Sequence, residues 1–468
     1  MPDNPLRKNK VNLSEYPYQK DIQYRLLMAE LTVFEVEVIS EILISSLKIT
    51  ISHLADLLEV DEAKLLPTLK ELKKMKLYKL EGETIHVDKE MRKYYDSQIP
   101  KFDDDFRADM EYLRGLLSNP PIHVLPLWYS IPRTSDDIFS SIIEKYLLTP
   151  KVYLRYLDEL SFDDPMLNKI MNDLFSTPDF IVRAKSLIEK YSLDREKFEE
   201  YMLLLEFNLI CCLSYGKREG KWEEVITPFY EWRQFLRNRR DSMPKLIENT
   251  TEIVRTHPSD FGFVQDMTKI LAPSLNKPLA LVVHENEGAL SKKTAQRILP
   301  HLDSHTLTDK YLQKLVTMLQ HLKLAEVKEN MLHPCKVAKT WLDKHLQEQA
   351  ISVYRYSSQA ANAIVGGYGN RNQRETERCL KKNCNTGWVY FEDFVKACTA
   401  PIGNNQTVSL QRKGKRWKYK IPEYTQEDID VLYSYIFENL FYAGKTATGT
   451  HNGKPCLCLT PFGRMTLD

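Results

Sequence analysis

The chain has 468 residues, and 43% of them are hydrophobic, which is enough to build several buried cores. Its 65 Lys and Arg residues and 64 Asp and Glu residues leave a formal net charge of +1 at pH 7. Such a chain has no overall field that attracts a polyanion, so any nucleic-acid binding has to come from local cationic patches.

The sequence indicates a cytoplasmic protein without a membrane segment. No window approaches the roughly 18 consecutive apolar residues of a membrane-spanning helix, and no apolar stretch follows the N-terminal cations as in a secretory signal. The eight cysteines are dilute and include no Cys-x-x-Cys, which is typical of a reducing compartment. Because Cys379, Cys384, Cys456 and Cys458 lack zinc-knuckle spacing, we expect buried free thiols, no metal and no cofactor.

The first predicted unit spans residues 24–88. A long helix opens it from Tyr24, and a short amphipathic helix begins at Ile51. A second helix begins at Asp61 and carries Leu at three- and four-residue spacing, and two strands then turn at Gly82. Residues 89–178 follow as a helical connector, which repeated Pro and Asp residues divide into short helices.

The same order of elements recurs in residues 179–232. Helices are expected over 181–190 and 194–206, with Asp194 as the N-cap of the second, and a hairpin turns at 216–220. A connector over 233–276 begins as a basic helix with three arginines on one face. These arginines either contact phosphates or form a solvated or acid-paired helix face; they are Arg233, Arg237 and Arg240.

Two further copies occupy the C-terminal half. The third, residues 277–346, has expected helices over 289–299 and 309–322 and a strand, turn and strand over 325–333. A linker over 347–374 separates it from the fourth, residues 375–468, which carries a basic insertion over 403–420. In the fourth, a helix over 428–440 precedes two strands that turn at 449–453.

This order of elements resembles the winged helix-turn-helix superfamily, and in the first unit Leu54, Leu65, Leu69 and Leu72 stand at the core positions of such domains. The ending Leu-Thr-x-x-Gly-Arg-x-x-Leu at 459–467 looks like the helicase-associated winged helices of bacterial proteins related to the XPB helicase of TFIIH. The tail of the third unit, residues 337–342, looks similar. The resemblance implies a mainly α fold with small β-hairpins (α+β), built from tandem winged-helix modules joined by helical connectors.

Motor and enzyme motifs are missing from the sequence. The only Gly-Lys-Thr, at 444–446, runs from a helix into a strand, which is the reverse of a phosphate loop. The tetrapeptide at 61–64 resembles an Asp-Glu-Ala-Asp box, but it has Lys in the fourth position and follows no phosphate loop. Common hydrolase, metalloprotease and dinucleotide fingerprints are absent too, so we expect no enzymatic activity.

The reading positions differ among the copies. The first turns of the second helix should carry polar or basic side chains in a DNA-binding winged helix. The first unit offers Leu66, Pro67 and Glu71 there, and the second unit is rich in Glu. The third unit is the best candidate for groove reading. Its exposed side is predicted to carry Lys310, Gln313, Lys314 and Thr317.

The densest basic segment of the chain lies in the insertion of the fourth unit. Its cations are expected to neutralise phosphates, while its aromatic residues either stack on bases or pack on the fold. The predicted nucleic-acid-binding residues of this segment are Arg412, Lys413, Lys415, Arg416, Trp417, Lys418 and Lys420.

Taken together, the sequence predicts a non-catalytic nucleic-acid-associated protein. It would be a DNA-binding accessory in transcription or DNA processing that uses its C-terminal winged helices, while the N-terminal winged helices dock a protein partner. The alternative is an interaction scaffold built from degenerate winged helices that binds no nucleic acid.

Overall fold

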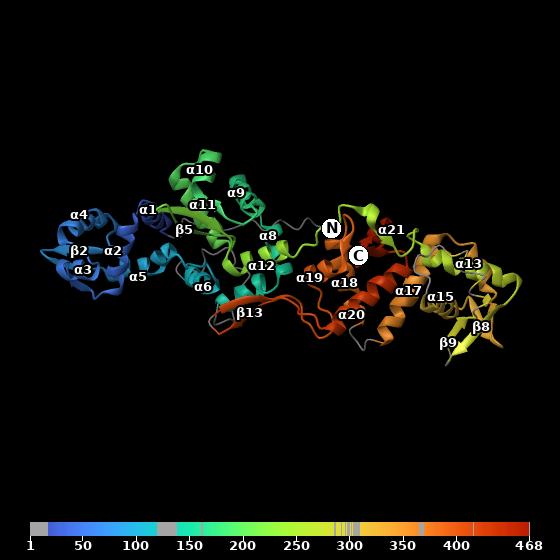
Figure 1. Ribbon diagram of the computed structural model, residues 1–468. Coiled ribbons are helices and arrows are strands. Elements are labelled where there is room, and N and C mark those ends of the chain that lie inside the picture. The colour runs from blue at the N-terminus through green and yellow to red at the C-terminus, as the bar shows by residue number, and fades with distance from the viewer. Residues whose placement is uncertain are drawn as a thin grey trace. The chain divides into compact units, whose positions relative to one another are not determined.

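The computed structural model is mainly helical, with small antiparallel sheets (Figure 1). It describes residues 17–118, 138–160, 162–284, 287–291, 293–294, 296, 300, 302, 309–364, 369–414 and 416–467. The chain divides into two compact units. The first unit comprises residues 1–237 with 409–420, and the second unit comprises residues 238–408 with 421–468. The four smaller units predicted from the sequence are called the first to fourth copies. No helix among the described residues is long and apolar enough to cross a membrane.

The first unit begins with two helices where one long helix was predicted from Tyr24. That prediction is wrong because Thr32 starts a new helix: its hydroxyl accepts from the Glu35 amide at 3.2 Å, and the Glu35 carboxylate accepts from the Thr32 amide at 2.8 Å. The elements up to the end of the first hairpin are α1 (Tyr18–Ala29), α2 (Val33–Ile44), β1 (Lys48–Thr50), α3 (Ile51–Leu57), α4 (Glu62–Leu72), η2 (Lys73–Met75), β2 (Tyr78–Glu81) and β3 (Thr84–Val87).

The predicted core residues of this region are confirmed. Leu54, Leu65, Leu69 and Leu72 are fully buried, together with Ile85 on β3. Short helices follow, as the proline and aspartate breaks predicted. They are α5 (Lys89–Gln98), η3 (Ile99–Phe102), α6 (Met110–Ser118), α7 (Ile138–Ile142), η6 (Ile143–Leu147), α8 (Pro150–Glu159) and α9 (Pro165–Ser176).

The second copy, which lies in the first unit, has its helices and hairpin close to where they were predicted. Asp194 caps its second helix, since its carboxylate accepts from the amide of Glu196 at 3.0 Å. The first helix begins at Ala184, later than predicted, because Val182 pairs with Ile226 in a strand. The elements are β4 (Val182–Arg183), α10 (Ala184–Tyr191), α11 (Arg195–Phe207), β5 (Cys212–Arg218), β6 (Lys221–Thr227) and α12 (Tyr230–Asp241).

The second unit holds the third and fourth copies. Its elements up to the end of the third hairpin are η7 (Thr250–Glu252), β7 (Val254–Arg255), α13 (Gly262–Asn276), β8 (Leu279–His284), β9 (Glu287–Leu290), α15 (Asp309–His321), β10 (Ala325–Lys328) and β11 (Met331–Pro334). The elements that follow are α16 (Val337–Leu342), α17 (Leu346–Ile364), α18 (Gly369–Asn383), β12 (Val389–Tyr390), α19 (Phe391–Ala397), α20 (Gln426–Ser434), η9 (Tyr435–Leu440), β15 (Thr446–His451), β16 (Lys454–Leu459) and α21 (Pro461–Thr466).

Two expectations for this half are wrong in part. The predicted helix over 289–299 does not start at 289, because 287–290 form β9; Lys293, Thr294 and Gln296 are helical, and the rest of that span lies outside the described residues. The predicted linker over 347–374 is instead helical in α17 and the start of α18, where Ala350 and Val353 are fully buried. The predicted helix over 428–440 is confirmed, and the hairpin after it forms, but its first strand extends to His451, so the turn predicted at 449–453 falls at Asn452 and Gly453.

One strand order is common to all four copies. In each, a short strand that precedes the hairpin in the sequence pairs with the last strand of the hairpin, which therefore lies between the other two. The orders are β1-β3-β2, β4-β6-β5, β8-β11-β10 and β12-β16-β15, with β9 and β7 added as extra edge strands in the last two. Figure 1 shows each small sheet beside its helices.

Local packing explains the Leu-Thr-x-x-Gly-Arg-x-x-Leu ending at 459–467. The Thr460 hydroxyl donates to the Gly444 carbonyl at 2.7 Å and accepts from the Gly463 amide at 2.9 Å. A Cβ at Gly463 would lie only 2.0 Å from the Lys445 carbonyl oxygen, so no larger residue fits there. The Leu-Thr-x-x-Gly pattern therefore seats α21 against the strand before it.

Candidate nucleic-acid interface

The basic insertion forms a two-stranded ribbon that belongs to the first unit, although the helices on either side of it, α19 and α20, belong to the second. We call β13 (Ser409–Lys413) and β14 (Arg416–Lys420) the ribbon. Leu410 faces Tyr419 across it, and Arg412 faces Trp417. Because side chains alternate between the faces of a strand, these four share the inner face, and the residues between them point outward.

The inner face of the ribbon is anchored to helices of the first unit. Leu410 and Tyr419 are buried. The Leu410 amide donates to the Leu148 carbonyl at 2.7 Å, and the Tyr419 hydroxyl donates to the Leu147 carbonyl at 2.8 Å. Burial raises the pKa of Tyr419, which keeps this hydroxyl protonated as a donor. The Phe235 ring of α12 packs on Tyr419 at 5.4 Å between centroids.

Glu111 of α6 holds the other inner pair. The Trp417 indole donates to the Glu111 carboxylate at 3.1 Å, and the Arg412 guanidinium lies 3.3 Å from the same carboxylate. The Phe139 ring meets Trp417 edge to face, with centroids 6.2 Å apart. Of the two interpretations of the aromatic residues, these contacts favour packing on the fold: Trp417 lies on the inner face, and Arg412 is paired with the same Glu111 carboxylate.

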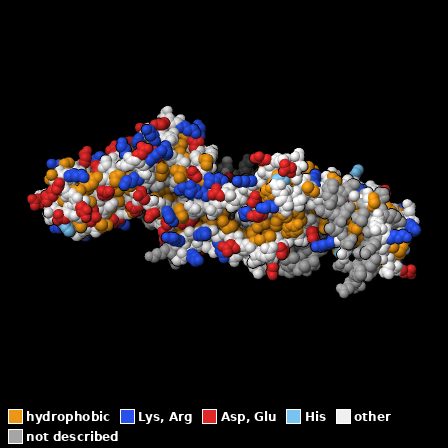
Figure 2. Space-filling model, in the orientation of Figure 1, with side chains coloured by type: hydrophobic (Ala, Val, Ile, Leu, Met, Phe, Trp, Pro, Cys, Tyr) orange, Lys and Arg blue, Asp and Glu red, His pale blue; other side chains and the backbone are white. Residues whose placement is uncertain are grey.

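The outer face of the ribbon carries four of the predicted binding residues. Lys413, Arg416, Lys418 and Lys420 are all exposed, and no ion pair to any of them is found among the described residues. Figure 2 shows Lys and Arg side chains on the surface where the ribbon lies. Lys415, at the turn, lies outside the described residues. This cationic face is the strongest local positive patch that the sequence predicted and the structure describes.

The polar residues predicted to read DNA in the third copy are less accessible to a ligand than the outer face of the ribbon. Lys310, Gln313, Lys314 and Thr317 do share one side of α15, but only Lys310 is fully exposed. The Lys314 ammonium lies 3.4 Å from the Glu438 carboxylate of η9, which compensates its charge. A helix whose central cation is paired in this way offers a phosphate little net attraction.

The second helix of the second copy, α11, is enclosed on nearly all sides. Arg25 of α1 reaches the Glu206 carboxylate at 2.7 Å, and Lys101 approaches it at 3.8 Å. Burial alone would raise the pKa of Glu206, but these two cations lower it below its ordinary value, so the carboxylate stays ionised. Because α1 packs on α11, mainly the N-terminal turn of this helix, with Glu196 and Lys197, remains exposed.

Two of the three arginines at the start of the predicted connector pair with carboxylates, and the third donates to a backbone carbonyl. Arg233 donates to the Asp179 carbonyl at 3.3 Å, and the Arg237 guanidinium lies 3.3 Å from the Asp179 carboxylate. Arg240 pairs with the neighbouring Asp241 at 2.8 Å. Of the two interpretations of this face, acid pairing is the one that the contacts support.

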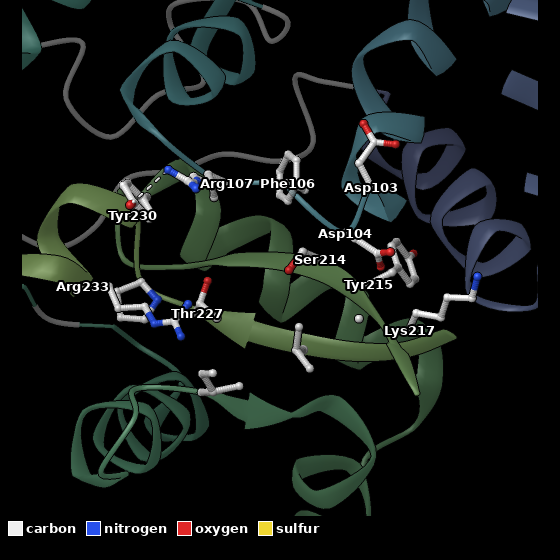
Figure 3. Close-up of a pocket in the computed structure, with 15 residues that line it drawn as sticks. Asp103, Asp104, Phe106, Arg107, Ser214, Tyr215, Lys217, Thr227, Tyr230 and Arg233 are labelled. Carbon is white, nitrogen blue, oxygen red and sulfur yellow. Dashed lines mark hydrogen bonds between the residues drawn. The ribbon is translucent and has the colours of Figure 1, made fainter. Parts of the chain in front are cut away.

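A cavity of about 380 Å³ lies in the first unit, between the outer face of the β5–β6 hairpin and the segment that precedes α6 (Figure 3). Arg107 donates to the Tyr230 hydroxyl at 3.3 Å, and its guanidinium lies over the Tyr230 ring at 5.0 Å. Asp103 and Asp104 line another part of the cavity, where burial and Asp104 raise the pKa of Asp103. Charges of both signs line the cavity, so it has no clear preference for an anion or a cation.

The cysteines and the Gly-Lys-Thr sequence singled out by the sequence can be located in the structure. In the part of the chain that the structure describes, no group of three or more His, Cys, Asp or Glu could hold a metal ion, and all eight cysteines are free thiols. Lys445, in the Gly-Lys-Thr sequence, is buried against the Tyr354 ring at 3.4 Å and donates to the Thr466 carbonyl at 3.3 Å. It is a packing residue at the start of a strand.

Comparison of the chain with protein-family models, curated proteins and solved structures gives no match. Function is therefore inferred from the geometry of the chain itself. Sequence reasoning missed Glu111, the residue that orients the inner face of the ribbon. Glu111 is 306 positions from Trp417, and no local pattern marks a carboxylate as the partner of so distant a side chain.

Proposed function

We propose that this chain is a non-catalytic, nucleic-acid-associated protein built from tandem winged helices, a DNA-binding accessory in transcription or DNA processing. The observation that carries the proposal is the outer face of the ribbon, with Lys413, Arg416, Lys418 and Lys420 exposed and without carboxylate partners among the described residues. Four adjacent uncompensated cations on a nearly neutral protein form a local field that attracts phosphates.

The common strand order supports the winged-helix part of the proposal. A winged helix needs a helix pair followed by a hairpin, and the strand before the pair closes a three-stranded sheet. The first, second and fourth copies have this order; in the third copy, most of the first helix of the pair lies outside the described residues. The copies differ in the elements packed against them and in their exposed side chains, and such differences allow one fold to serve different functions.

The four second helices are poorer candidates for the DNA contact than the ribbon. The early turns of α4 carry Leu66 and Pro67, and α11 is covered by α1. Lys314 of α15 is paired with Glu438. The helix α20 begins with carboxylates, which repel phosphates. The binding function therefore belongs on the ribbon, with Lys310 of α15 as a secondary contact.

The test is a titration of labelled duplex DNA by fluorescence anisotropy at 50 and 200 mM salt. Replacing the four outer-face cations with Ser should weaken binding by at least about tenfold at the lower salt concentration. The matched control replaces four exposed lysines elsewhere in the first unit, namely Lys79, Lys89, Lys93 and Lys221. The proposal fails if the wild-type chain shows no salt-dependent binding, or if both quadruple variants bind equally well.

A second candidate, an interaction scaffold, is favoured by one specific surface of the second unit. Val431 and Tyr433 of α20 are exposed, and the Tyr433 ring stacks on Phe437 with centroids 4.3 Å apart. The exposed carboxylates of Glu427 and Asp430 lie on the same helix. An apolar surface flanked by acids suits a protein partner better than a nucleic acid.

The two N-terminal copies differ in the surface that they offer to a protein partner. The first copy leaves Leu57 and Leu66 exposed on α3 and α4, so a partner docked there has apolar surface to bury. In the second copy most of α11 is already covered, so a partner would have to bind its hairpin or the exposed side of α10. Binding of DNA would not exclude such a partner, but a chain that binds no DNA would leave docking as its function.

A further inference from the structure

We infer that the ribbon grips the phosphate backbone of duplex DNA without reading the base sequence and with a preference for the duplex over a single strand. This inference rests on the proposed function and specifies its ligand. It follows from which side chains face inward, how the outward cations are spaced, and how firmly the ribbon is held.

The aromatic side chains of the ribbon are unavailable to bases. Proteins that bind single-stranded nucleic acid stack successive bases on exposed aromatic rings beside a cationic groove. Here Tyr419 is buried, and the Trp417 indole is held by Glu111 on the inner face. A single strand would therefore meet cations alone and gain nothing for its unstacked bases.

The outward cations form a regular row. Arg416, Lys418 and Lys420 occupy alternate positions on β14, so their Cα atoms are spaced at about 6.7 Å, twice the rise of an extended residue. Lys413 faces Arg416 across the ribbon and adds a fourth charge at one end of the row. A straight row of cations complements a row of phosphates, and duplex DNA carries about twice the charge per unit length of one strand.

The chemistry of the outer face favours charge neutralisation over base recognition. Three of the four cations are lysines, which act as point charges without the planar fork that pairs with guanine. Gln411, which has the amide group that could recognise adenine, lies on the same face, but its amide donates to the Ser409 hydroxyl at 3.2 Å. Only Arg416 retains a bidentate donor, which is too little to specify a sequence.

The ribbon is also held in place before any ligand arrives. Its backbone is bonded to Leu148, the Tyr419 hydroxyl to Leu147, and two inner side chains to Glu111. A ligand therefore does not have to order the strand that carries the cations. Pre-organisation of this kind lowers the entropic cost of binding.

The experiment uses the full chain and three labelled probes of equal length: two duplex DNAs of unrelated sequence and one single strand. The two duplexes should bind equally within about twofold, and the single strand about tenfold more weakly. For the duplexes, log K against log salt should have a slope of about −3.6 for four phosphate contacts, and each Lys-to-Ser change at 413, 418 or 420 should reduce its magnitude by about 0.9.

A Trp417→Leu variant separates packing from stacking. It should change duplex and single-strand affinity by the same factor, because the indole touches neither probe. Selective loss of single-strand binding would overturn the inference, as would a single strand that binds as tightly as the duplexes or a preference above tenfold between the two duplexes. In all three cases salt-dependent binding would persist and the proposed function would stand, whereas failure of every probe to bind would remove both.

Discussion

The helix α11 and the ribbon are both rich in charge, but the fold uses their charges in opposite ways. Around α11, Glu199 and Glu206 are fully buried and face Arg25, so the charges hold the first unit together. On the ribbon, the outward cations meet no carboxylate among the described residues. The difference teaches that the density of charged residues in a sequence does not show whether they stabilise the fold or are available to a ligand. What distinguishes the two cases is whether each charge has a buried partner of opposite sign.

The largest expected effect is at the buried pair. Replacing Arg25 with Ala should destabilise the first unit by about 3 to 5 kcal/mol, because the ionised carboxylate of Glu206 would remain buried with only Lys101 nearby. Urea unfolding followed by circular dichroism measures the loss. Arg416→Ala serves as the control and should unfold like the wild type. If the wild type, Arg25→Ala and Arg416→Ala were equally stable, the buried charges around α11 would not stabilise the first unit more than the exposed cations of the ribbon do.

The second effect is a pH dependence at Glu199. Burial raises the pKa of Glu199 from 4.5 to about 7, with Arg25 and Arg195 opposing the shift. A carboxyl whose folded pKa is raised contributes stability at low pH and loses it as the pH rises through about 7. Glu199→Gln should remove this loss, gaining up to about 3 kcal/mol relative to wild type between pH 5 and 8. Thermal melts across this range test it, and a difference that does not change with pH would refute it.

The third effect concerns the attachment of the ribbon. Tyr419→Phe removes the hydroxyl that donates to Leu147 and leaves a buried carbonyl without that partner, which should cost about 1 to 2 kcal/mol. Limited proteolysis at the ribbon and the urea midpoint report the loss. Because the outer face is unchanged, DNA affinity should fall only if the ribbon loosens. Unchanged stability and unchanged proteolysis would show that the ribbon is held by its other contacts alone.

The smallest structural effect, and the clearest functional one, is expected at Lys418. Lys418→Ser should leave the unfolding transition unchanged, because the side chain is exposed and has no ion pair in the described part of the chain, while duplex affinity falls about threefold to tenfold at low salt. Anisotropy titration measures the affinity. The matched control is Lys221→Ser, at the exposed first residue of β6 in the same unit. If Lys418→Ser destabilised the protein, the outward cations of the ribbon would stabilise the fold, as the charges around α11 do.

Much of the local structure could be predicted from the sequence, because its causes are local. Leucine spacing located the buried face of α4, and Asp194 marked the start of α11. The break at Thr32 was missed because the apolar period continues across it, although the Thr and Glu of the capping box stand there. The helix α17 was missed because glycines beyond its end suggested a linker.

The candidate site could be predicted only in part, for a physical reason. Alternation along a strand identifies which side chains share a face, but it does not say which face is covered. The answer depends on Glu111 and Leu148, which lie more than 250 positions before the ribbon in the sequence. The enclosure of α11 likewise depends on Arg25, 181 positions from Glu206.

The path of the chain has a practical consequence for dissecting the protein. Residues 409–420 complete the first unit, yet they are synthesised after most of the second. An expression fragment that ends at residue 237 would lack the two strands that cover Phe235 and satisfy Glu111, and would expose an apolar surface to aggregation. The two halves therefore cannot be separated by a single cut, and a nascent chain completes its first half only after residue 420 has been synthesised.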